Sequence, residues 1–272
     1  MKSAQALGVG RAPLPQRLID AAARHRVYRD LFEFALVALA FLFYFLVRAA
    51  VVNETGEALG NAEHIINFEK MLGIFWEPRL QQVVIGRQLL IQLFNFIYFW
   101  LDFPLIVLVG LWLYVFKRHE YTVARDALLL SGAIALIVYN LFPVMPPRLL
   151  PSGEFVDTVR RYSNVSYQAQ STKAFVNPYA AVPSLHFGWA MVLGAVIYFS
   201  TRNWLLRGFG ILLPWAELAA IVFTANHFLV DAAAGLIVCL VGVLLALAMQ
   251  RWGYPAVRRW AEARWRLVES PP

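Results

Sequence analysis

The stretch FLVDAAAGLIVCLVGVLLALAM, residues 228–249, carries Asp231 as its one charged residue. An α-helix needs about 20 mainly apolar residues to cross the hydrocarbon core of a bilayer, so this stretch predicts a transmembrane helix. The composition agrees, because 60% of the residues are hydrophobic and 15% are charged. An ordinary soluble domain is less apolar and more charged. The sequence therefore predicts a membrane protein.

Five more apolar stretches approach or exceed this length, and with the first they predict an all-α polytopic protein of six transmembrane helices. They run from Leu31 to Val52, Leu89 to Phe116, Ala127 to Met145, Ser184 to Ser200 and Trp204 to Thr224. The second is long enough to be tilted or broken near Asp102 and Pro104. The chain then divides into a basic N-terminal segment (1–30), a six-span membrane domain (31–250) and a C-terminal tail (251–272).

The distribution of Lys and Arg predicts the orientation of the spans. With both termini in the cytoplasm, about 16 of the 24 Lys and Arg residues lie on the inner side, as the positive-inside rule requires. The formal net charge of +7 therefore reflects topology, and we predict no nucleic-acid partner. We expect an integral protein of the plasma membrane, with residues 53–88 and 146–183 outside.

Two segments between the first and second spans, Glu63 to Gly73 and Glu77 to Ile85, mix apolar and charged residues at helical spacing. This pattern predicts helices that lie in the membrane interface, where they either cover a site or simply pack. The long outer loop from Pro146 to Pro183 is aromatic and bounded by prolines. Loops of this size in compact membrane proteins are often functional.

Alternating crossings bring three basic or titratable residues to one membrane face. The end of the third span, the start of the fourth, and the turn between the fifth and sixth all lie outside. Arg148, His186 and His227 fall at these three places. Their convergence favours a catalytic site at the outer face.

His227 and Asp231 are four residues apart at the start of a helix, so their side chains share a face. A carboxylate can fix the imidazole tautomer and stabilise its positive charge. One ring nitrogen then remains to attack phosphorus or to abstract a proton. Taken alone, the pair is equally consistent with a helix-start histidine that has a local carboxylate partner.

Ser184 and Arg148 are candidates for binding phosphate. Ser184 is suited to cap the helix that follows it, and backbone NH groups at a helix start bind phosphate. His186 would then face the leaving oxygen and protonate it. The guanidinium of Arg148, which follows a proline-rich segment, can grip phosphate oxygens bidentately. Read singly, Pro-Ser is only a helix-start signal, and the arginine equally suits lipid headgroups.

Taken together, these motifs resemble the type 2 phosphatidic acid phosphatase superfamily. The resemblance rests on Pro183-Ser184-Leu185-His186, on Asn226-His227, and on the Asp231 and Gly235 that follow. The form of the motifs and the segment Glu69 to Gly73 are more similar to the inositol phosphorylceramide synthase branch, which consists of inositolphosphotransferases.

The resemblance implies that His227 is the nucleophile and forms a phosphohistidine, that Asp231 orients it, and that His186 is the general acid and base. Arg148 and Ser184 would bind the phosphate. It also implies no metal and no other cofactor, and a substrate that is a phosphate ester or diester carried by a membrane lipid. Water would make the protein a phosphatase, and an alcohol or polyol acceptor would make it a transferase.

The chain lacks two basic residues that the family pattern commonly has for binding phosphate. Leu141 stands where the first motif commonly has a lysine, and Leu149 follows Arg148. The third motif lacks its usual upstream arginine, because residues 220–222 read Ala-Ile-Val. Lys173 in the outer loop is a candidate to supply the missing charge, although loop lysines are more often simply solvated.

Asp102 and Glu217 are predicted near mid-membrane, where an ionisable group is expensive and is therefore suspected of function. Asp102 and Asn226 are further candidates for the substrate pocket. Two rival hypotheses are a transporter, in which Asp102, Glu217 and Asp231 form an ion pathway, and a non-catalytic lipid-binding member of the family. The oligomeric state stays open.

Overall fold

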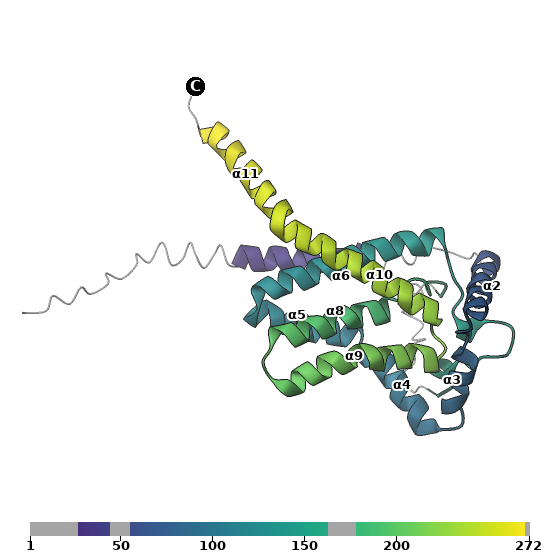
Figure 1. Ribbon diagram of the computed structural model, residues 1–272. Helices are drawn as coiled ribbons and strands as arrows, with labels where there is room; N and C mark the ends of the chain where they lie inside the picture. The colour runs from purple at the N-terminus through teal and green to yellow at the C-terminus, as the bar shows by residue number, and fades with distance from the viewer. Residues whose placement is uncertain (1–26, 44–54, 163–177, 270–272) are drawn as a thin grey trace, which may run out of the picture. The chain divides into compact units, whose positions relative to one another are not determined.

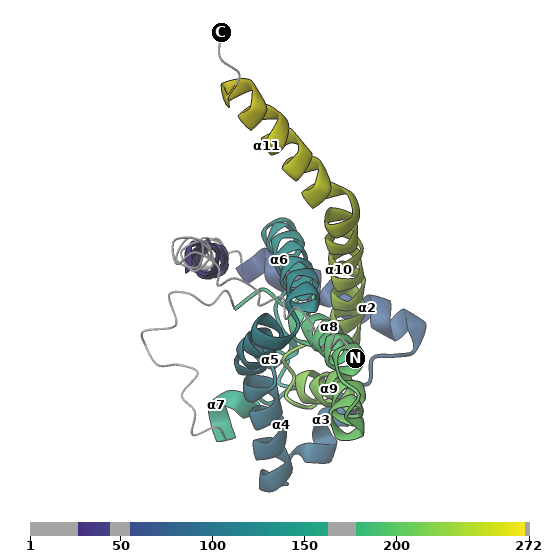
Figure 2. The ribbon, with the colours of Figure 1, turned by 90° about the vertical axis from the view of Figure 1, so that its left-hand side faces the viewer.

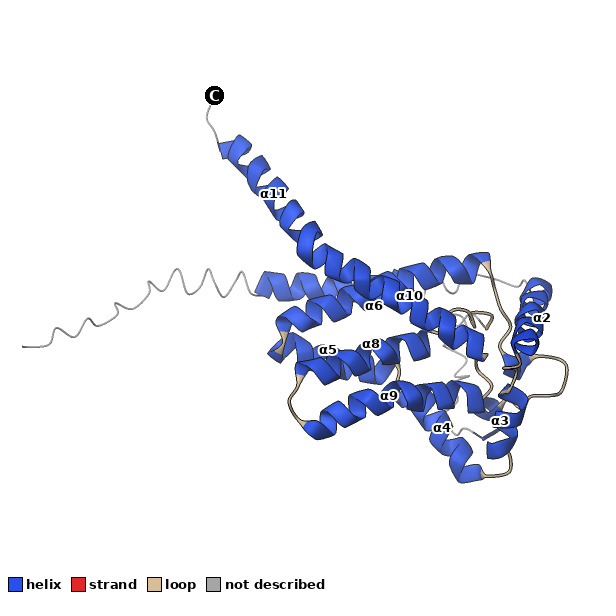
Figure 3. Ribbon diagram, viewed as in Figure 1, coloured by secondary structure: helices blue, strands red, loops and turns tan. Residues whose placement is uncertain are grey.

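The computed structural model describes residues 27–43, 55–162 and 178–269. Within these residues the chain consists of helices and loops, with one isolated β-bridge between Val144 and Ala180 and no strand (Figure 3). The prediction of an all-α fold is therefore confirmed. Lys173 lies outside the described residues.

The helices divide between two compact units. Residues 27–43 form a helix in the first unit, and the second unit begins at Tyr44. The helices of the second unit are α2 (Thr55–Leu72), α3 (Glu77–Val84), α4 (Gln88–Trp100), α5 (Phe103–Phe116), α6 (Arg118–Leu141), α7 (Thr158–Tyr162), α8 (Leu185–Ser200), α9 (Trp204–Phe223), α10 (Leu229–Ala248) and α11 (Tyr254–Glu269). A π-helical turn, Met249–Gly253, joins α10 to α11, and a 3-10 turn, Pro147–Leu149, follows α6.

Helix α8 lies at the centre of a bundle, where it packs against α6, α9 and α10 (Figures 1 and 2). Glycines allow the helices to approach closely. A Cβ built on Gly194 of α8 would collide with the carbonyl oxygen of Gly210 of α9, and one built on Gly235 of α10 would collide with Ser184. Small residues at such crossings are the usual device for packing helices in membranes.

Among the described residues, three helices are long and apolar enough to cross a membrane: Arg118–Leu141, Trp204–Phe223 and the continuous stretch Leu229–Ala263. Helices α3 and α4 are bent by 119° and make a fourth span if they are counted together. Helices α5 and α8 are apolar but shorter. The structure thus supports three or four candidate spans, and the six predicted from the sequence are not confirmed.

The predicted spans and the observed helices differ in two places. The expected second span, Leu89 to Phe116, is divided at Asp102 into α4 and α5, because Pro104 in the first turn of α5 has no NH to continue a helix. The first expected span, Leu31 to Val52, is helical as far as residue 43, and its remaining residues lie outside the described ranges.

Large apolar side chains cover the outer surfaces of the bundle. Leu108 and Phe116 of α5 are exposed, as are Leu212 of α9 and Leu244 of α10. A water-soluble protein rarely shows apolar surface on so many helices at once. These surfaces indicate a membrane protein, while the interfacial position expected for α2 and α3 stays a prediction.

Helices α2 and α3 lie at the end of the bundle where α10 begins (Figure 1). Their side chains reach its first turn, since Glu69 of α2 and Glu77 of α3 both accept hydrogen bonds from α10 backbone NH groups. The segments between the first two expected spans therefore pack on the bundle rather than standing apart from it.

Candidate active site

Two histidines from different helices meet at this end of the bundle. His186 is in the first turn of α8, and His227 is in the turn between α9 and α10. Their ring centroids are 5.7 Å apart, with an angle of 53° between the planes. The structure therefore brings together the two histidines that were expected to converge.

The end of α9 determines where His227 lies. Ala225 adopts a positive φ of 55°, and its NH bonds to the Val222 carbonyl at 3.0 Å. The NH of Asn226 bonds to the Ile221 carbonyl at 2.9 Å. This pattern is a Schellman motif, which usually has glycine at the left-handed position. Alanine there costs about 1 kcal/mol, so the packing of the turn must offset that cost.

The ring of His227 is buried and held by two acceptors. Its Nδ1 lies 2.9 Å from the carbonyl oxygen of Ala181 and 3.3 Å from Oδ2 of Asp231. A carbonyl only accepts, so Nδ1 carries the proton and donates it. In the neutral ring, Nε2 is then the basic nitrogen, which is the tautomer that a nucleophile or base requires.

Asp231 is fully buried and serves both the backbone and the histidine. Its Oδ2 also accepts the NH of Phe228 at 2.9 Å, which caps the first turn of α10. Its carbonyl accepts the NH of Ser184 at 2.9 Å and so ties α10 to the start of α8. The side chains of His227 and Asp231 are therefore paired, as their spacing predicted.

His186 has a carboxylate partner of its own. Its Nε2 lies 3.3 Å from Oδ2 of Asp102, and both side chains are about 20% exposed. The ring of Tyr98 stacks on His186, with centroids 4.3 Å apart and planes within 15°. The sequence suggested Asp102 as a pocket residue, and the structure places its carboxylate on the second histidine.

Arg148 is hydrogen-bonded to the turn that carries His227. Its NH bonds to the Ala225 carbonyl at 2.8 Å, and its Nε donates to Oδ1 of Asn226 at 2.7 Å. The amide nitrogen of Asn226 in turn donates to Oγ1 of Thr224 at 2.6 Å. Both ends of the Asn226 amide thus have protein partners, and its place in the site is to orient Arg148.

A second carboxylate contacts the same guanidinium. Oδ2 of Asp157 lies 3.4 Å from an Arg148 terminal nitrogen. The residues on either side of Asp157 are clamped: Gln81 makes two hydrogen bonds to the Val156 backbone, and Asn95 bonds both the carbonyl and the hydroxyl of Thr158. Sequence reasoning missed this arrangement, because its partners lie far apart in the chain.

Ser184 does not cap α8 as expected. It occupies the N-cap position, but its hydroxyl makes no cap hydrogen bond. Its backbone is engaged instead, with the NH bonded to Asp231 and the carbonyl accepting the Gly188 NH at 3.2 Å. The hydroxyl is fully buried with no hydrogen-bond partner. Such a group is costly, and a bound acceptor such as a phosphate oxygen would satisfy it.

Two buried glutamates, which the sequence did not mark as site residues, lie at the first turn of α10. Glu69 accepts the Val230 NH and Glu77 accepts the Leu229 NH, both at 2.8 Å. Both side chains are fully buried. Burial, followed by the neighbouring Glu77, raises the pKa of Glu69 from its ordinary value of 4.5 to about 9. Glu69 therefore carries a proton at neutral pH.

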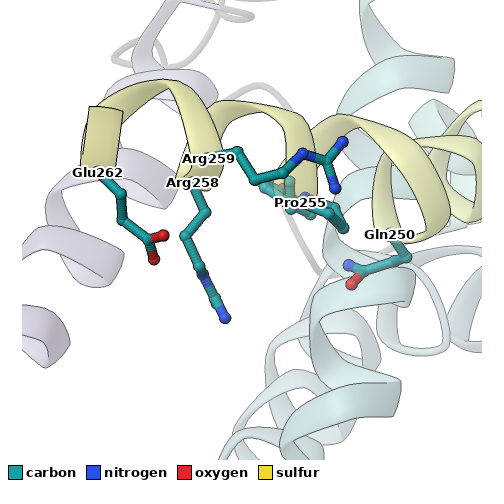
Figure 4. Close-up of a pocket in the computed structure, with 6 residues that line it drawn as sticks. Gln250, Pro255, Arg258, Arg259 and Glu262 are labelled. Atoms are coloured by element: carbon teal, nitrogen blue, oxygen red, sulfur yellow. The ribbon is translucent and has the colours of Figure 1, made fainter. Parts of the chain in front are cut away.

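A hollow of about 300 Å³ lies at α11, lined by Gln250, Tyr254, Pro255, Arg258, Arg259 and Glu262 (Figure 4). It is at the C-terminal end of α10, whereas His227 precedes the N-terminal end. A helix of this length puts roughly 30 Å between the two. The hollow contains no histidine, so the histidine pair is the stronger candidate for chemistry.

A family model described as the PAP2 superfamily matches residues 63–245, about two thirds of the chain. The chain belongs to the PAP2 superfamily. Membership suggests a lipid phosphatase or phosphotransferase. The matched region contains both histidines and every side chain described above around them. Comparison with curated proteins and with solved structures found no significant match.

Within the described part of the chain, Arg148 brings a basic side chain to the turn that carries His227. Arg160 of α7, another arginine of the outer loop, is exposed, and its backbone NH bonds to Asp157. Among the described residues, no group of three or more His, Cys, Asp and Glu side chains is arranged to hold a metal ion.

Proposed function

We propose that this PAP2 protein is a membrane-embedded enzyme that transfers a phosphoryl or substituted phosphoryl group from a lipid through a phosphohistidine at His227. The observation that carries the proposal is the pair of histidine rings 5.7 Å apart, each in contact with a carboxylate. Paired titratable groups with separate partners are the arrangement that acid and base roles require.

In the first step, Nε2 of His227 attacks phosphorus and the bond from phosphorus to the leaving oxygen breaks. His186 donates a proton to that oxygen, so the lipid leaves as a neutral alcohol. Asp231 balances the positive charge that develops on the His227 ring. Arg148 and the buried hydroxyl of Ser184 donate hydrogen bonds to the phosphate oxygens. A guanidinium is suited to this role because its hydrogen bonds to phosphate are charge-assisted.

In the second step, an acceptor hydroxyl attacks phosphorus and the bond from phosphorus to His227 breaks. His186, neutral after the first step, takes the acceptor's proton and returns to its starting charge. If water is the acceptor, the protein is a lipid phosphatase. If an alcohol or polyol is the acceptor, it is a phosphotransferase.

The form of the motifs favours transfer over hydrolysis, because they are similar to those of inositol phosphorylceramide synthases. We expect the acceptor to be an alcohol or polyol. The distribution of Lys and Arg supports a plasma-membrane protein with cytoplasmic termini and the site outside. Cysteine-labelling from each side of the membrane tests that orientation.

The test is turnover of a panel of lipid phosphates and phosphoinositides by the purified protein, with and without alcohol acceptors. We expect turnover by wild type and by His119→Ala, which removes an exposed histidine from α6. We expect none from His227→Ala. Release of phosphate without an acceptor identifies a phosphatase, and acceptor-dependent product identifies a transferase. Equal turnover by His227→Ala contradicts the proposal and favours the transporter or lipid-binding hypotheses.

A further inference from the structure

The break between α4 and α5 supplies a carboxylate to the site. Helix α4 closes with a hydrogen bond from the Leu101 NH to the Ile97 carbonyl, and Pro104 lies in the first turn of α5. Asp102 sits between the two helices, at the N-cap of α5. The division of a long apolar run is therefore what brings an acidic residue to His186.

The side chain of Asp102 does not do what its position predicts. Aspartate at an N-cap normally accepts an NH from the first turn of its helix. Asp102 makes no side-chain cap hydrogen bond to α5, and its carboxylate lies on Nε2 of His186 at 3.3 Å. A capping residue that is diverted from its helix points to a role at the histidine.

Several groups lie around His186 and its partner Asp102. Asp102 and the stacked ring of Tyr98 come from the α4 side, and His227 precedes α10. Glu217 of α9 is fully buried, neither of its carboxyl oxygens has a hydrogen-bond partner, and it interacts electrostatically with Asp102. Among these side chains, Asp102 is the one whose carboxylate contacts the His186 ring directly.

We propose that Asp102 is a positioning residue for His186, which it holds as the imidazolium that protonates the leaving oxygen. This inference rests on the proposed function. The Nε2 proton stays in the contact with Asp102, and the second ring nitrogen carries the proton that moves. That proton passes to the leaving oxygen as its bond to phosphorus breaks and the bond from phosphorus to His227 forms.

Each histidine then has its own carboxylate, and the two carboxylates act at different stages of the reaction. Asp102 stabilises positive charge on His186 before the first step, and Asp231 stabilises positive charge on His227 after it. The proton returns to His186 from the acceptor hydroxyl in the second step. Asp102 never accepts it, because a carboxylate in this place acts by orientation and charge.

The test compares two phosphate monoesters with water or glycerol as acceptor. The alkoxide of decyl phosphate needs a proton in order to leave, whereas the nitrophenolate of p-nitrophenyl phosphate does not. We expect Asp102→Asn to lower kcat/KM for decyl phosphate, which reports on the first step alone, by roughly 100-fold, the lower end of the range for general acid catalysis. We expect kcat/KM for p-nitrophenyl phosphate to change by less than about threefold, because its leaving group needs no proton.

The matched control is Asp126→Asn, which neutralises a buried carboxylate of α6 that is paired with Arg125. Asp126 lies roughly 20 Å along the helix from Tyr139, the α6 residue that contacts the Pro183 carbonyl. We expect this control to leave the ratio of the two kcat/KM values unchanged. Asp102→Ser is the second neutral variant, to be used if the asparagine variant does not fold.

Equal loss of kcat/KM on both esters in a folded Asp102 variant overturns the inference and makes Asp102 a structural residue. The double variant Asp102→Asn with His186→Ala must be no slower than His186→Ala alone, because Asp102 acts through that ring. An additive loss also overturns it. Failure of the proposed function gives a different result: His227→Ala turns over either ester, or wild type turns over neither.

Discussion

Gly235→Ala should strongly destabilise the protein, although alanine is the better helix former. Gly235 lies inside α10, where alanine would gain about 1 kcal/mol of helix propensity. Its Cβ would collide with the Ser184 carbonyl oxygen, and it would lie 2.8 Å from the Ser184 carbonyl carbon and 3.2 Å from the Ser184 nitrogen. These are backbone atoms, so the start of α8 must move.

The size of the effect follows from these contacts. Overpacking that displaces backbone costs about 3 kcal/mol. The same movement weakens the hydrogen bond from the Ser184 NH to the Asp231 carbonyl, which contributes about 1 kcal/mol. After the propensity gain, the free energy of unfolding falls by about 3 kcal/mol. For a chain of this size the Tm falls by roughly 6 to 12 °C.

The assay is thermal unfolding of the purified protein in detergent, followed by intrinsic tryptophan fluorescence. Gly208→Ala is the matched control, because Gly208 is also inside a helix and its Cβ would meet nothing within 4 Å. It should leave the Tm unchanged or raise it slightly. A Tm for Gly235→Ala equal to that of Gly208→Ala would refute the close approach of α8 and α10.

Three further predictions concern the groups around the histidines. Arg148→Lys should raise KM by about tenfold or more with a small change in stability, because lysine cannot both keep the hydrogen bond to Asn226 and bind phosphate bidentately. Steady-state kinetics measures KM, and an unchanged value would argue against phosphate binding by Arg148. Ala225→Val should lower the free energy of unfolding by about 2 kcal/mol or more, because a β-branched residue is strained at positive φ. Denaturant titration measures this free energy. Because the pKa of Glu69 is raised to about 9, the stability linked to it is full below about pH 4.5 and is lost as the pH rises toward 9. Glu69→Gln should remove that slope, which is at most about 1.4 kcal/mol per pH unit, and Tm measured across the range tests it.

Local spacing and topology made part of the site predictable. The pairing of His227 with Asp231 follows from a four-residue spacing at a helix start. The meeting of His186 with His227 follows from the order of the apolar segments, because consecutive helices alternate in direction. Both inferences need only the period of the helix and the parity of the crossings.

Contacts between distant parts of the chain could not be predicted in this way. Gln81 clamps Val156 across 75 positions, and Glu69 reaches Val230 across 161 positions. No periodicity links such residues, and a buried glutamate on an amphipathic helix looks the same in sequence as a solvated one. The placement of Asp157 on Arg148 depends on these long-range clamps.

Ser184 shows why a residue-type rule failed. Serine before an apolar run predicts a helix cap, but that rule takes no account of the neighbouring helix. Gly235 brings α10 against the Ser184 backbone, and the hydroxyl is left without the expected NH partner. The apolar run from Leu89 to Phe116 shows a similar limit of sequence patterns, because it forms two separate helices, α4 and α5.

Trapping the covalent intermediate tests whether His227 is the nucleophile. The purified protein is denatured at alkaline pH during turnover of p-nitrophenyl phosphate, and intact and peptide masses locate the transferred phosphoryl group. We predict an acid-labile phosphoryl group on His227 in wild type and His119→Ala, and none in His227→Ala. A phosphoryl group elsewhere in the chain, or steady turnover by His227→Ala, would contradict the assignment of His227 as the nucleophile.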